Sequence, residues 1–310
     1  MHMDKIYDMI IIGGGPGGYT AALYAVRAGL DTLILEKMMP GGQMALTHQI
    51  DNYPGFDEGI DGFSLGMKMK QGAEKFGAVS KSEEVRGVEL SGTIKRVLTD
   101  SGEYSARTVV LASGANPRML GIPGEAERYG RGIHYCAACD GMFYKGKTVA
   151  VVGGGNTAAA DALLLSRIAG KVLVIHRRDT LRATKIYHEP LMRAPNVEFH
   201  WDSEVTALRE SDGALVGLTL KNRKTGALTD VDCDGVFVSI GRIPATELFS
   251  GQVELDAEGY IIADESTRTN LPGVFAVGDL RTKPMRQIIT AASDGAVAAF
   301  YAEEYLAENG

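Results

Sequence analysis

The chain has 310 residues, which corresponds to about two domains at roughly 100–200 residues each. Hydrophobic residues make up 45% of it and charged residues 23%, as is ordinary for a globular protein. A net charge of −7 argues against nucleic acid as the main partner, and there is no apolar run of about 18 residues that would predict a membrane span. The opening MHMDKIYD lacks the basic and then apolar pattern of a secretion signal, so we expect a cytoplasmic protein.

The first predicted unit is a strand, a glycine turn, a helix and a second strand. Residues 6–15 (IYDMIIIGGG) predict a buried parallel strand, PGGYTAALYAVRAG predicts a helix, and DTLILEK predicts a strand that ends at Glu36. Gly13, Gly15 and Gly18 have the G-x-G-x-x-G spacing that lets the backbone approach a pyrophosphate at a helix N-terminus. Because Glu36 lies where a carboxylate accepts a hydrogen bond from a ribose hydroxyl, the unit predicts a dinucleotide site.

Residues 134–143 (HYCAACDGMF) contain two cysteines separated by two alanines, with an aspartate directly behind them. In a chain with only three cysteines, such a pair favours a catalytic or metal-binding role over a structural disulfide framework. One thiol of a C-x-x-C pair often has a lowered pKa, and the thiolate is the attacking form in disulfide exchange. The alternative is a zinc site made of His134, Cys136, Cys139 and Cys233, but Cys233 lies in a distant stretch and is expected to be a small buried hydrophobic residue.

The first unit recurs at residues 147–179. KTVAVVGGG predicts a strand and a glycine turn, NTAAADALLLSRIAG predicts a helix, and KVLVIHRRD predicts a second strand. Gly153 and Gly155 take the places of the first two glycines, whereas Ala158 takes the place of the third. The sequence therefore predicts a second dinucleotide site.

Basic residues replace the acid at the end of this second strand. His176 stands at the position of Glu36 and is followed by Arg177 and Arg178, with Arg182 a few residues on. A carboxylate there would repel a ribose 2′-phosphate, whereas guanidinium groups can bind it through two hydrogen bonds each. A solvated strand end is the alternative interpretation, but the match to the acid position favours a free ribose at the first site and NADP(H) at the second.

Two similar segments mark where the chain is expected to pass between its halves. VVLASGANP (109–117) and VFVSIGRIP (236–244) are apolar strands that end in glycine, at Gly114 and Gly241, with proline three residues later. The intervening stretches TIKRVLTD and LVGLTLKN alternate in polarity and predict antiparallel strands.

The C-terminal part predicts a last strand and a long helix. VFAVGD runs into Asp279, and the helical pattern begins near Gln287. Asp279 could cap a turn, but a strand that ends in Gly-Asp just before a long helix would place its carboxylate near a nucleotide.

In chain order, GGGPGG, GGQ, CAACD, GGGNTA, HRRDxxR, IGRxPxT and VGD followed by RQ resemble the low-molecular-weight bacterial thioredoxin reductases over essentially the whole chain. The resemblance implies an α/β fold of two Rossmann-like, three-layer ββα dinucleotide-binding domains. It implies an FAD-binding domain at 1–117 and 247–310, with an NADPH-binding domain inserted at 118–246. The family is dimeric, and its NADPH domain rotates to present either nicotinamide to flavin or the dithiol to thioredoxin.

The resemblance also implies which residues bind the two cofactors. The N-terminus of the last helix would favour an anionic reduced flavin. The residues implied for FAD are Gly13, Gly15, Pro16, Gly18, Glu36, Gly42, Gln43, Asn52, Gly114, Asp279, Arg286 and Gln287. The residues implied for NADPH are Gly153, Gly155, Asn156, Thr157, His176, Arg177, Arg178 and Arg182.

The implied activity is that of an NADPH-dependent thioredoxin-disulfide reductase. NADPH would reduce FAD, reduced FAD would reduce the Cys136–Cys139 disulfide, and Cys136 would attack the disulfide of thioredoxin. Asp140 would move a proton on or off the thiol, for which a carboxyl in a dry site would have a raised pKa.

Three other functions compete with this interpretation. The closest rival is a reductase of another thioredoxin-like or peroxidase-linked protein disulfide. CAACD and HRRDxxR argue against a flavin oxidase or ferredoxin-type reductase, and two intact nucleotide motifs argue against a redox sensor.

Three positions depart from the family. They are Ala138 where threonine is usual, Arg242 where histidine is frequent, and Ala160 where an acid is common.

Overall fold

The structure is a computed structural model that describes residues 5–37, 39–47 and 49–309. The chain divides into two compact units, the first made of Met1–Asn116 and Ile243–Gly310 and the second of Pro117–Arg242. The second unit is therefore an insertion in the first. The assignment of the units to particular cofactors remains a prediction from the sequence.

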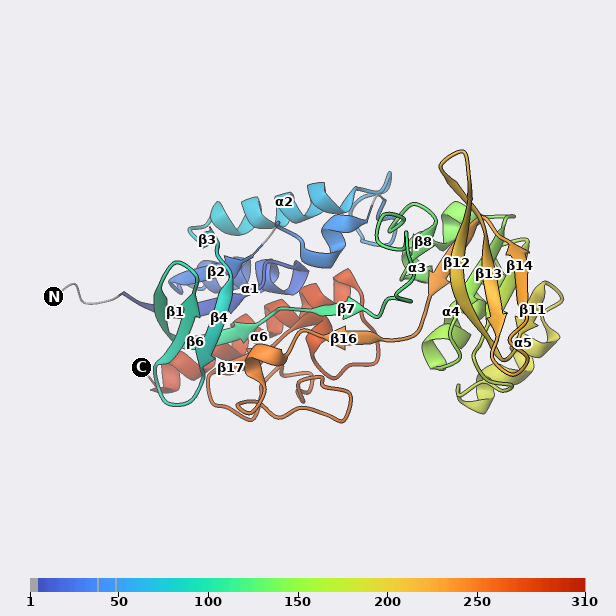
Figure 1. Cartoon of the computed structure of the whole chain (residues 1–310). Coiled ribbons are helices and arrows are strands. Elements are labelled where there is room, and N and C mark those ends of the chain that lie inside the picture. The colour runs from blue at the N-terminus through green and yellow to red at the C-terminus, as the bar shows by residue number, and fades with distance from the viewer. Residues whose placement is uncertain (1–4, 38, 48, 310) are drawn as a thin grey trace. The chain divides into compact units, whose positions relative to one another are not determined.

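The first unit is built on a seven-stranded sheet with the order β3-β2-β1-β6-β5-β4, in which β17 also pairs with β6 (Figure 1). Its parallel strands are β1 (Ile6–Ile12), β2 (Thr32–Glu36), β3 (Val79–Ser82), β6 (Glu103–Leu111) and β17 (Val274–Ala276), and β4 (Val85–Glu89) and β5 (Lys95–Thr99) are antiparallel.

Alternate residues of the strands in this unit face two different cores. Met9 and Ile11 of β1 pack with Tyr19 and with the alanines of the last helix on one face. Ile10 and Ile12 pack on the opposite face with residues of β4 and β5 and of the segment 249–280. Both sets are buried because successive side chains of a strand point to opposite faces, so the unit has three layers. The helices of this unit are α1 (Pro16–Arg27), α2 (Gly62–Glu74) and α6 (Ile288–Asn309).

The second unit repeats this plan around a five-stranded parallel sheet with the order β11-β10-β9-β15-β8. One face is covered by helices, and the other by the antiparallel strands β12, β13 and β14, which lie side by side in Figure 1. The strands are β8 (Ile133–His134), β9 (Thr148–Val152), β10 (Lys171–Ile175), β11 (Val197–His200), β12 (Ser203–Ser211), β13 (Ala214–Asn222), β14 (Leu228–Asp232) and β15 (Gly235–Val238), and the helices are α3 (Ala137–Asp140), α4 (Asn156–Ser166) and α5 (His188–Arg193).

The apolar parts of the two crossover segments predicted from the sequence belong to β6 and β15 of the main sheets, whereas their last three residues pair in a small sheet of their own. It consists of β7 (Ala115–Pro117) and β16 (Arg242–Pro244). Five short 3₁₀ turns complete the described elements: η1 (Gly42–Leu46), η2 (Gly141–Tyr144), η3 (Lys185–Tyr187), η4 (Glu247–Phe249) and η5 (Gly278–Leu280). The predicted α/β class and the antiparallel strands β5 and β13 are confirmed. Within the described ranges, no helix has both the length and the apolar character needed to cross a membrane.

Candidate active site

The residues predicted to hold a nucleotide in the first unit lie at the carboxyl edge of its parallel strands. Gly13 follows β1, Glu36 ends β2, Gly114 comes shortly after β6, and Asp279 comes shortly after β17. Because parallel strands end on the same edge of a sheet, these residues share one side of the unit. Open α/β sheets bind their ligands at this edge.

Each of the three glycines of the first turn is required for a different structural reason. Gly13 has φ 111°, and a Cβ on it would collide with the carbonyl of Ala112. A Cβ on Gly18 would overlap the carbonyl oxygen of Gly13, so this position requires glycine for the helix to pack against the turn. A Cβ on Gly15 would meet nothing within 4 Å, which leaves space for a ligand at the N-terminus of α1. This geometry fits a pyrophosphate, and Pro16 opens the helix without an N–H to be satisfied.

Glu36 and the GGQ segment complete this turn. The Oε2 atom of Glu36 accepts a hydrogen bond of 2.6 Å from the backbone N of Gly14. The N–H of Gly41 donates to the carbonyl of Gly14 at 2.8 Å, which brings the following Gly42 next to Gly15. The GGQ segment therefore lies directly against the first glycine motif.

The remaining predicted residues of the first unit form contacts with one another. The Nε atom of Arg286 donates to the carbonyl of Asp279 at 3.3 Å, and its guanidinium lies 4.0 Å from the centre of the Tyr260 ring. Asn52 Nδ2 donates to Gln287 Oε1 at 3.1 Å. Gln43, by contrast, donates to Asn116 at 2.9 Å, so this amide is engaged beside β7.

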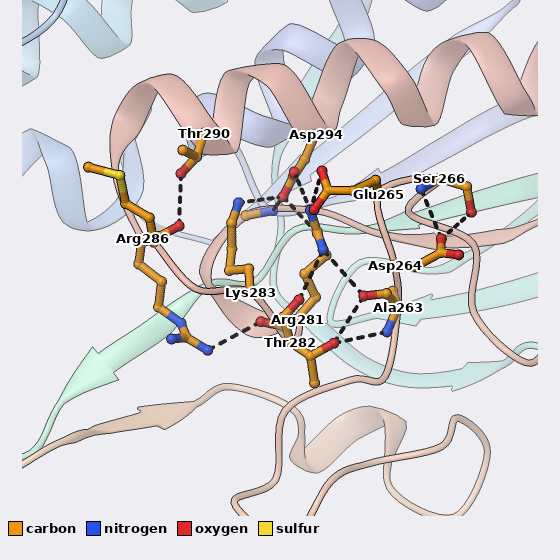
Figure 2. A network of polar contacts seen from close by, with 12 residues as sticks. Ala263, Asp264, Glu265, Ser266, Arg281, Thr282, Lys283, Arg286, Thr290 and Asp294 are labelled. Carbon is orange, nitrogen blue, oxygen red and sulfur yellow. Dashed lines mark hydrogen bonds and ion pairs between the residues drawn. The ribbon is translucent and has the colours of Figure 1, made fainter. Parts of the chain in front are cut away.

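A buried ionic network that the sequence interpretation missed anchors the Asp279 turn. Asp294 Oδ2 accepts hydrogen bonds from Gly278 N at 2.8 Å, from Arg281 Nε at 3.0 Å and from Lys283 Nζ at 2.7 Å. Figure 2 shows the Arg281 and Lys283 side chains converging on the Asp294 carboxylate of α6. Burial alone would raise the pKa of Asp294, but the hydrogen bonds from Arg281 and Lys283 lower it below its ordinary value. The alternating cations of DLRTK were the one available sequence signal.

The glycine turn of the second unit has the same construction with one change. Gly153 has φ 150°, and a Cβ on it would collide with the carbonyl of Ser239. Gly155 is open except for the Arg182 guanidinium, which would lie 4.0 Å from its Cβ. Ala158 is buried at the third position, where the first unit has Gly18. The open face at Gly155 again fits a pyrophosphate.

His176 lies at the centre of a group of exposed arginines. Its ring is buried against Gly154, where a Cβ would overlap it, and no described residue makes a hydrogen bond to its Nε2 atom. Burial lowers the pKa of His176, and the charges of Arg182, Arg177 and Arg178 lower it further. The imidazole is therefore neutral at pH 7, and the positive charge of this strand end belongs to the three arginines.

Two further predicted residues lie at the start of α4. Asn156 and Thr157 are both exposed there, and Asn156 Oδ1 accepts a hydrogen bond from the N–H of Thr184 at 2.8 Å. The backbone N of Arg182 donates to the carbonyl of Gly154 at 2.7 Å. The segment after β10 is thus fixed against the glycine turn, which places the Arg182 side chain beside Gly155.

The dithiol lies between β8 and η2 in the second unit. Cys136 and Cys139 form a disulfide with a Cα–Cα distance of 5.3 Å, and α3 begins directly after Cys136. Both cysteines are partly exposed, and Asp140 follows on the same turn of helix. Cys233 instead packs in the core under β13, where burial raises the pKa of its thiol to about 12. The described residues contain no cluster of three or more metal-binding side chains.

None of the three departures from the family is buried, and Arg242 is partly exposed. Ala138 and Ala160 are both exposed. The next residue, Asp161, does carry a carboxylate, and its Oδ2 atom accepts a hydrogen bond of 2.6 Å from Ser239. Burial raises the pKa of Asp161, although the bond from Ser239 and the charge of Arg242 oppose this. The spacing argument overlooked Asp161 because it compared single positions.

Residues 7–295 match the family described as pyridine nucleotide-disulphide oxidoreductase. The thioredoxin reductase of Streptomyces coelicolor is 47% identical, over 98% of this chain and 95% of that protein. The thioredoxin reductase of Peptoclostridium acidaminophilum is 43% identical, over 99% of each chain. The crystal structure of thioredoxin reductase from Streptococcus pyogenes superposes with a TM-score of 0.91 at 44% identity, over 98% of this chain and 99% of that one.

The chain therefore belongs to the pyridine nucleotide-disulphide oxidoreductase family. Membership of this family implies FAD and NAD(P)H as cofactors, and the two glycine turns fit dinucleotides. Within the family, similarity over its full length groups the chain with the low-molecular-weight thioredoxin reductases. The resemblance inferred from the sequence motifs is confirmed.

Proposed function

We propose that this chain is a thioredoxin-disulfide reductase in which electrons pass from NADPH through FAD to the Cys136–Cys139 disulfide and then to oxidised thioredoxin. The observation that carries the proposal is the disulfide followed by Asp140, in the same unit as the second, basic dinucleotide turn. Bound FAD supplies two-electron chemistry, accepting a hydride and passing two electrons to a disulfide. As in the family it resembles, the chain is proposed to act as a cytoplasmic homodimer.

The first unit is proposed to hold the FAD. The open backbone at Gly15 and the N-terminus of α1 would face the pyrophosphate. The Glu36 carboxylate is oriented by its bond to Gly14 and would accept from the adenosine ribose. Asp279, with Arg286 bonded to its carbonyl, would lie toward the ribityl chain and ring edge.

The second unit is proposed to hold NADPH. Three exposed arginines surround the buried, neutral His176, and Arg182 lies beside the open Gly155. Arg177 and Arg178 would bind the 2′-phosphate, because guanidinium groups match phosphate oxygens through paired hydrogen bonds. An uncharged imidazole below them avoids adding a fourth, desolvated cation.

The chain's own thiols would carry the exchange with thioredoxin. In the reduced enzyme, the Cys136 thiolate attacks one sulfur of the thioredoxin disulfide and displaces the other as a thiolate, which takes a proton from Asp140. The Cys139 thiol then gives its proton to Asp140 and attacks Cys136, which releases the second thioredoxin sulfur as a thiolate and re-forms the intramolecular disulfide. Asp140 passes that proton to the released thiolate. Two electrons and two protons leave the enzyme in each cycle.

The test is NADPH oxidation with and without added oxidised thioredoxin. We expect turnover only with thioredoxin, and we expect Cys136→Ser to abolish it while NADPH still reduces the bound flavin. Full thioredoxin turnover by Cys136→Ser would remove the dithiol from the reaction. A colourless protein that cannot be reconstituted with FAD would contradict the flavin assignment.

A further inference from the structure

We infer that His134 is a positioning residue for Asp140, holding this carboxyl beside the dithiol and coupling its gain or loss of a proton to Tyr144. The inference rests on the proposed function, because it assigns a partner to the proton-carrying group of the same site.

The three side chains form a continuous line of hydrogen bonds. His134 Nδ1 lies 2.9 Å from Asp140 Oδ2, and His134 Nε2 lies 2.7 Å from the Tyr144 hydroxyl. The exposed fraction falls from 16% for the Asp140 side chain to 4% for that of His134. The line therefore leads from the partly exposed dithiol region into the core of the unit.

The surrounding packing fixes the His134 and Tyr144 rings, which the Nε2 hydrogen bond joins. The His134 ring stacks on Phe237 at 5.3 Å with an interplanar angle of 27°, and the Tyr144 ring meets Phe237 edge-on at 5.6 Å. Gly235 makes room for Tyr144, because a Cβ there would collide with the Tyr144 ring. His134 and Phe237 are directly opposite one another on β8 and β15. A side chain held in this way keeps its hydrogen bonds in one geometry.

Because both nitrogens of the His134 ring are hydrogen-bonded, a proton gained at Asp140 changes the direction of the hydrogen bond to Tyr144 at the other end. When Asp140 is ionised, His134 donates from Nδ1 to the carboxylate, and the Tyr144 hydroxyl donates to Nε2. One added proton gives either an imidazolium beside a carboxylate or a neutral imidazole beside a carboxylic acid. In both cases Nε2 becomes a donor and the Tyr144 hydroxyl must turn to accept. Burial, reinforced by the charge of Asp140, raises the pKa of Tyr144 to about 12, so its hydroxyl reorients without ionising.

Few other charges bear on this line. The charges of Asp140 and Arg242 affect the pKa of Tyr129. The charges of Asp234 and Cys233, in addition to that of Asp140, affect the pKa of Tyr144. Burial raises the pKa of Tyr129 and that of Cys233, so neither group ionises near pH 7. Among the described residues around the line, Asp140 and His134 are therefore the pair through which the proton of the exchange reaction would move.

The reaction balances with this shared proton. The thiolate displaced from the partner disulfide takes the proton held by the Asp140–His134 pair. The pair then accepts the proton of Cys139 and passes it to the second displaced thiolate. The dithiol is oxidised, the protein disulfide is reduced, and the pair regains its proton when the dithiol is next reduced.

The test uses the flavin-loaded enzyme with thioredoxin across a range of pH. His134→Phe keeps the stack on Phe237 but removes both hydrogen bonds. We expect turnover to fall about tenfold and the limb of the pH–rate profile that depends on Asp140 to move to higher pH, because the carboxylate loses a hydrogen-bond donor. His134→Asn keeps a donor near the Nδ1 position and should recover part of both effects.

The controls separate coupling from packing. His200→Asn alters another histidine of the same unit, 3.0 Å from Glu198, and should leave the rate and the profile unchanged. All variants should keep NADPH-dependent ferricyanide reduction within about twofold, because this acceptor bypasses the dithiol. Tyr144→Phe keeps the ring but removes the hydroxyl, and should shift the profile in part. An unaltered rate and profile in His134→Phe would overturn the inference.

A second readout does not depend on thioredoxin turnover. In the ¹⁵N-histidine-labelled enzyme, we expect the His134 nitrogen shifts to change when dithiothreitol reduces the disulfide, and to change less in Asp140→Asn. If thioredoxin is not a substrate but these shifts follow the dithiol, the proposed function fails and the inference stands. If the shifts ignore both reduction and Asp140→Asn, the inference fails.

Discussion

The two nucleotide units have the same backbone frame and opposite chemistry at one point. In each, the N–H of a residue from the segment after the second strand donates to the carbonyl of the turn's middle glycine: Gly41 to Gly14 at 2.8 Å, and Arg182 to Gly154 at 2.7 Å. In each, the residue at the end of that strand contacts the same glycine. It is Glu36 in the first unit and His176 in the second.

This difference supports the proposal that both turns hold a dinucleotide and that the strand end distinguishes a free ribose from a ribose 2′-phosphate. Glu36 is bonded to the turn as a carboxylate that can accept from a ribose. His176 occupies the equivalent space as a neutral ring and leaves Arg177 and Arg178 exposed around it. In the proposed function, the difference in side chains at the strand end, on a shared backbone frame, separates a nucleotide with a free ribose from one with a 2′-phosphate.

The largest expected effect is on the choice of coenzyme. Changing Arg177 and Arg178 together to alanine removes two sets of charge-assisted hydrogen bonds to the 2′-phosphate, each worth about 1.5–3 kcal/mol. We expect kcat/KM for NADPH to fall about 10²- to 10⁴-fold while that for NADH changes little. Steady-state kinetics with both coenzymes measure this.

Arg193→Ala is the matched control, since Arg193 is an exposed arginine of the same unit paired with Glu189 at 2.7 Å. It should leave both coenzymes unaffected. If kcat/KM falls equally for NADPH and NADH in the double variant, the arginines do not bind the 2′-phosphate. The proposed difference between the two strand ends would then be wrong.

The units also differ in how they bury a carboxylate. Asp294 of the first unit carries two cationic partners and has a pKa below its ordinary value. Asp161 of the second unit has one hydroxyl partner, and burial raises its pKa. Ionised Asp294 therefore stabilises its unit, whereas ionised Asp161 costs stability in its own.

The second prediction concerns Asp294→Ala. This change leaves Arg281 and Lys283 buried without their shared carboxylate, and we expect a loss of about 3–5 kcal/mol in the free energy of unfolding at pH 7. Because the pKa of Asp294 is lowered by folding, its contribution is complete above about pH 4 and is lost as the pH falls through the folded pKa. Denaturant unfolding at several pH values measures both effects.

Glu304→Ala tests whether location matters, because Glu304 lies on the same helix in an exposed pair with Arg268 at 2.6 Å. It should cost no more than about 1 kcal/mol. A loss for Asp294→Ala as small as this, or one that persists unchanged at pH 3, would mean that the buried network does not hold the Asp279 turn.

The strand–helix–strand units and the dithiol could be predicted because their signals are local. The spacing of Gly13, Gly15 and Gly18 reflects backbone conformations and close contacts within a few residues. The structure shows a separate reason for glycine at each position. The replacement of Glu36 by His176 was also visible once the two units were aligned.

The side-chain networks could not be predicted because they depend on tertiary packing. Asp294 meets Arg281 only because α6 returns along the sheet, and Asp161 meets Ser239 only where α4 crosses the end of β15. His134 lies six residues before its partner Asp140, but the bond needs the turn made by α3 and η2. Apart from the cations of DLRTK, no periodicity or motif in the sequence indicates such contacts.

The smallest expected effect tests the third glycine position, where the units differ between Gly18 and Ala158. Gly18→Ala adds a methyl group that would overlap the Gly13 carbonyl oxygen, so α1 must shift, and we expect a loss of about 1–3 kcal/mol in the free energy of unfolding together with weaker flavin retention. Ala158→Gly removes the corresponding methyl group and should cost only about 1 kcal/mol through helix propensity, with the KM for NADPH unchanged. Denaturant unfolding and the flavin content of the purified variants distinguish the two. If Gly18→Ala retains flavin and stability like the wild type, the first turn has room for the side chain that the second already carries, and the two frames are more alike than their glycines indicate.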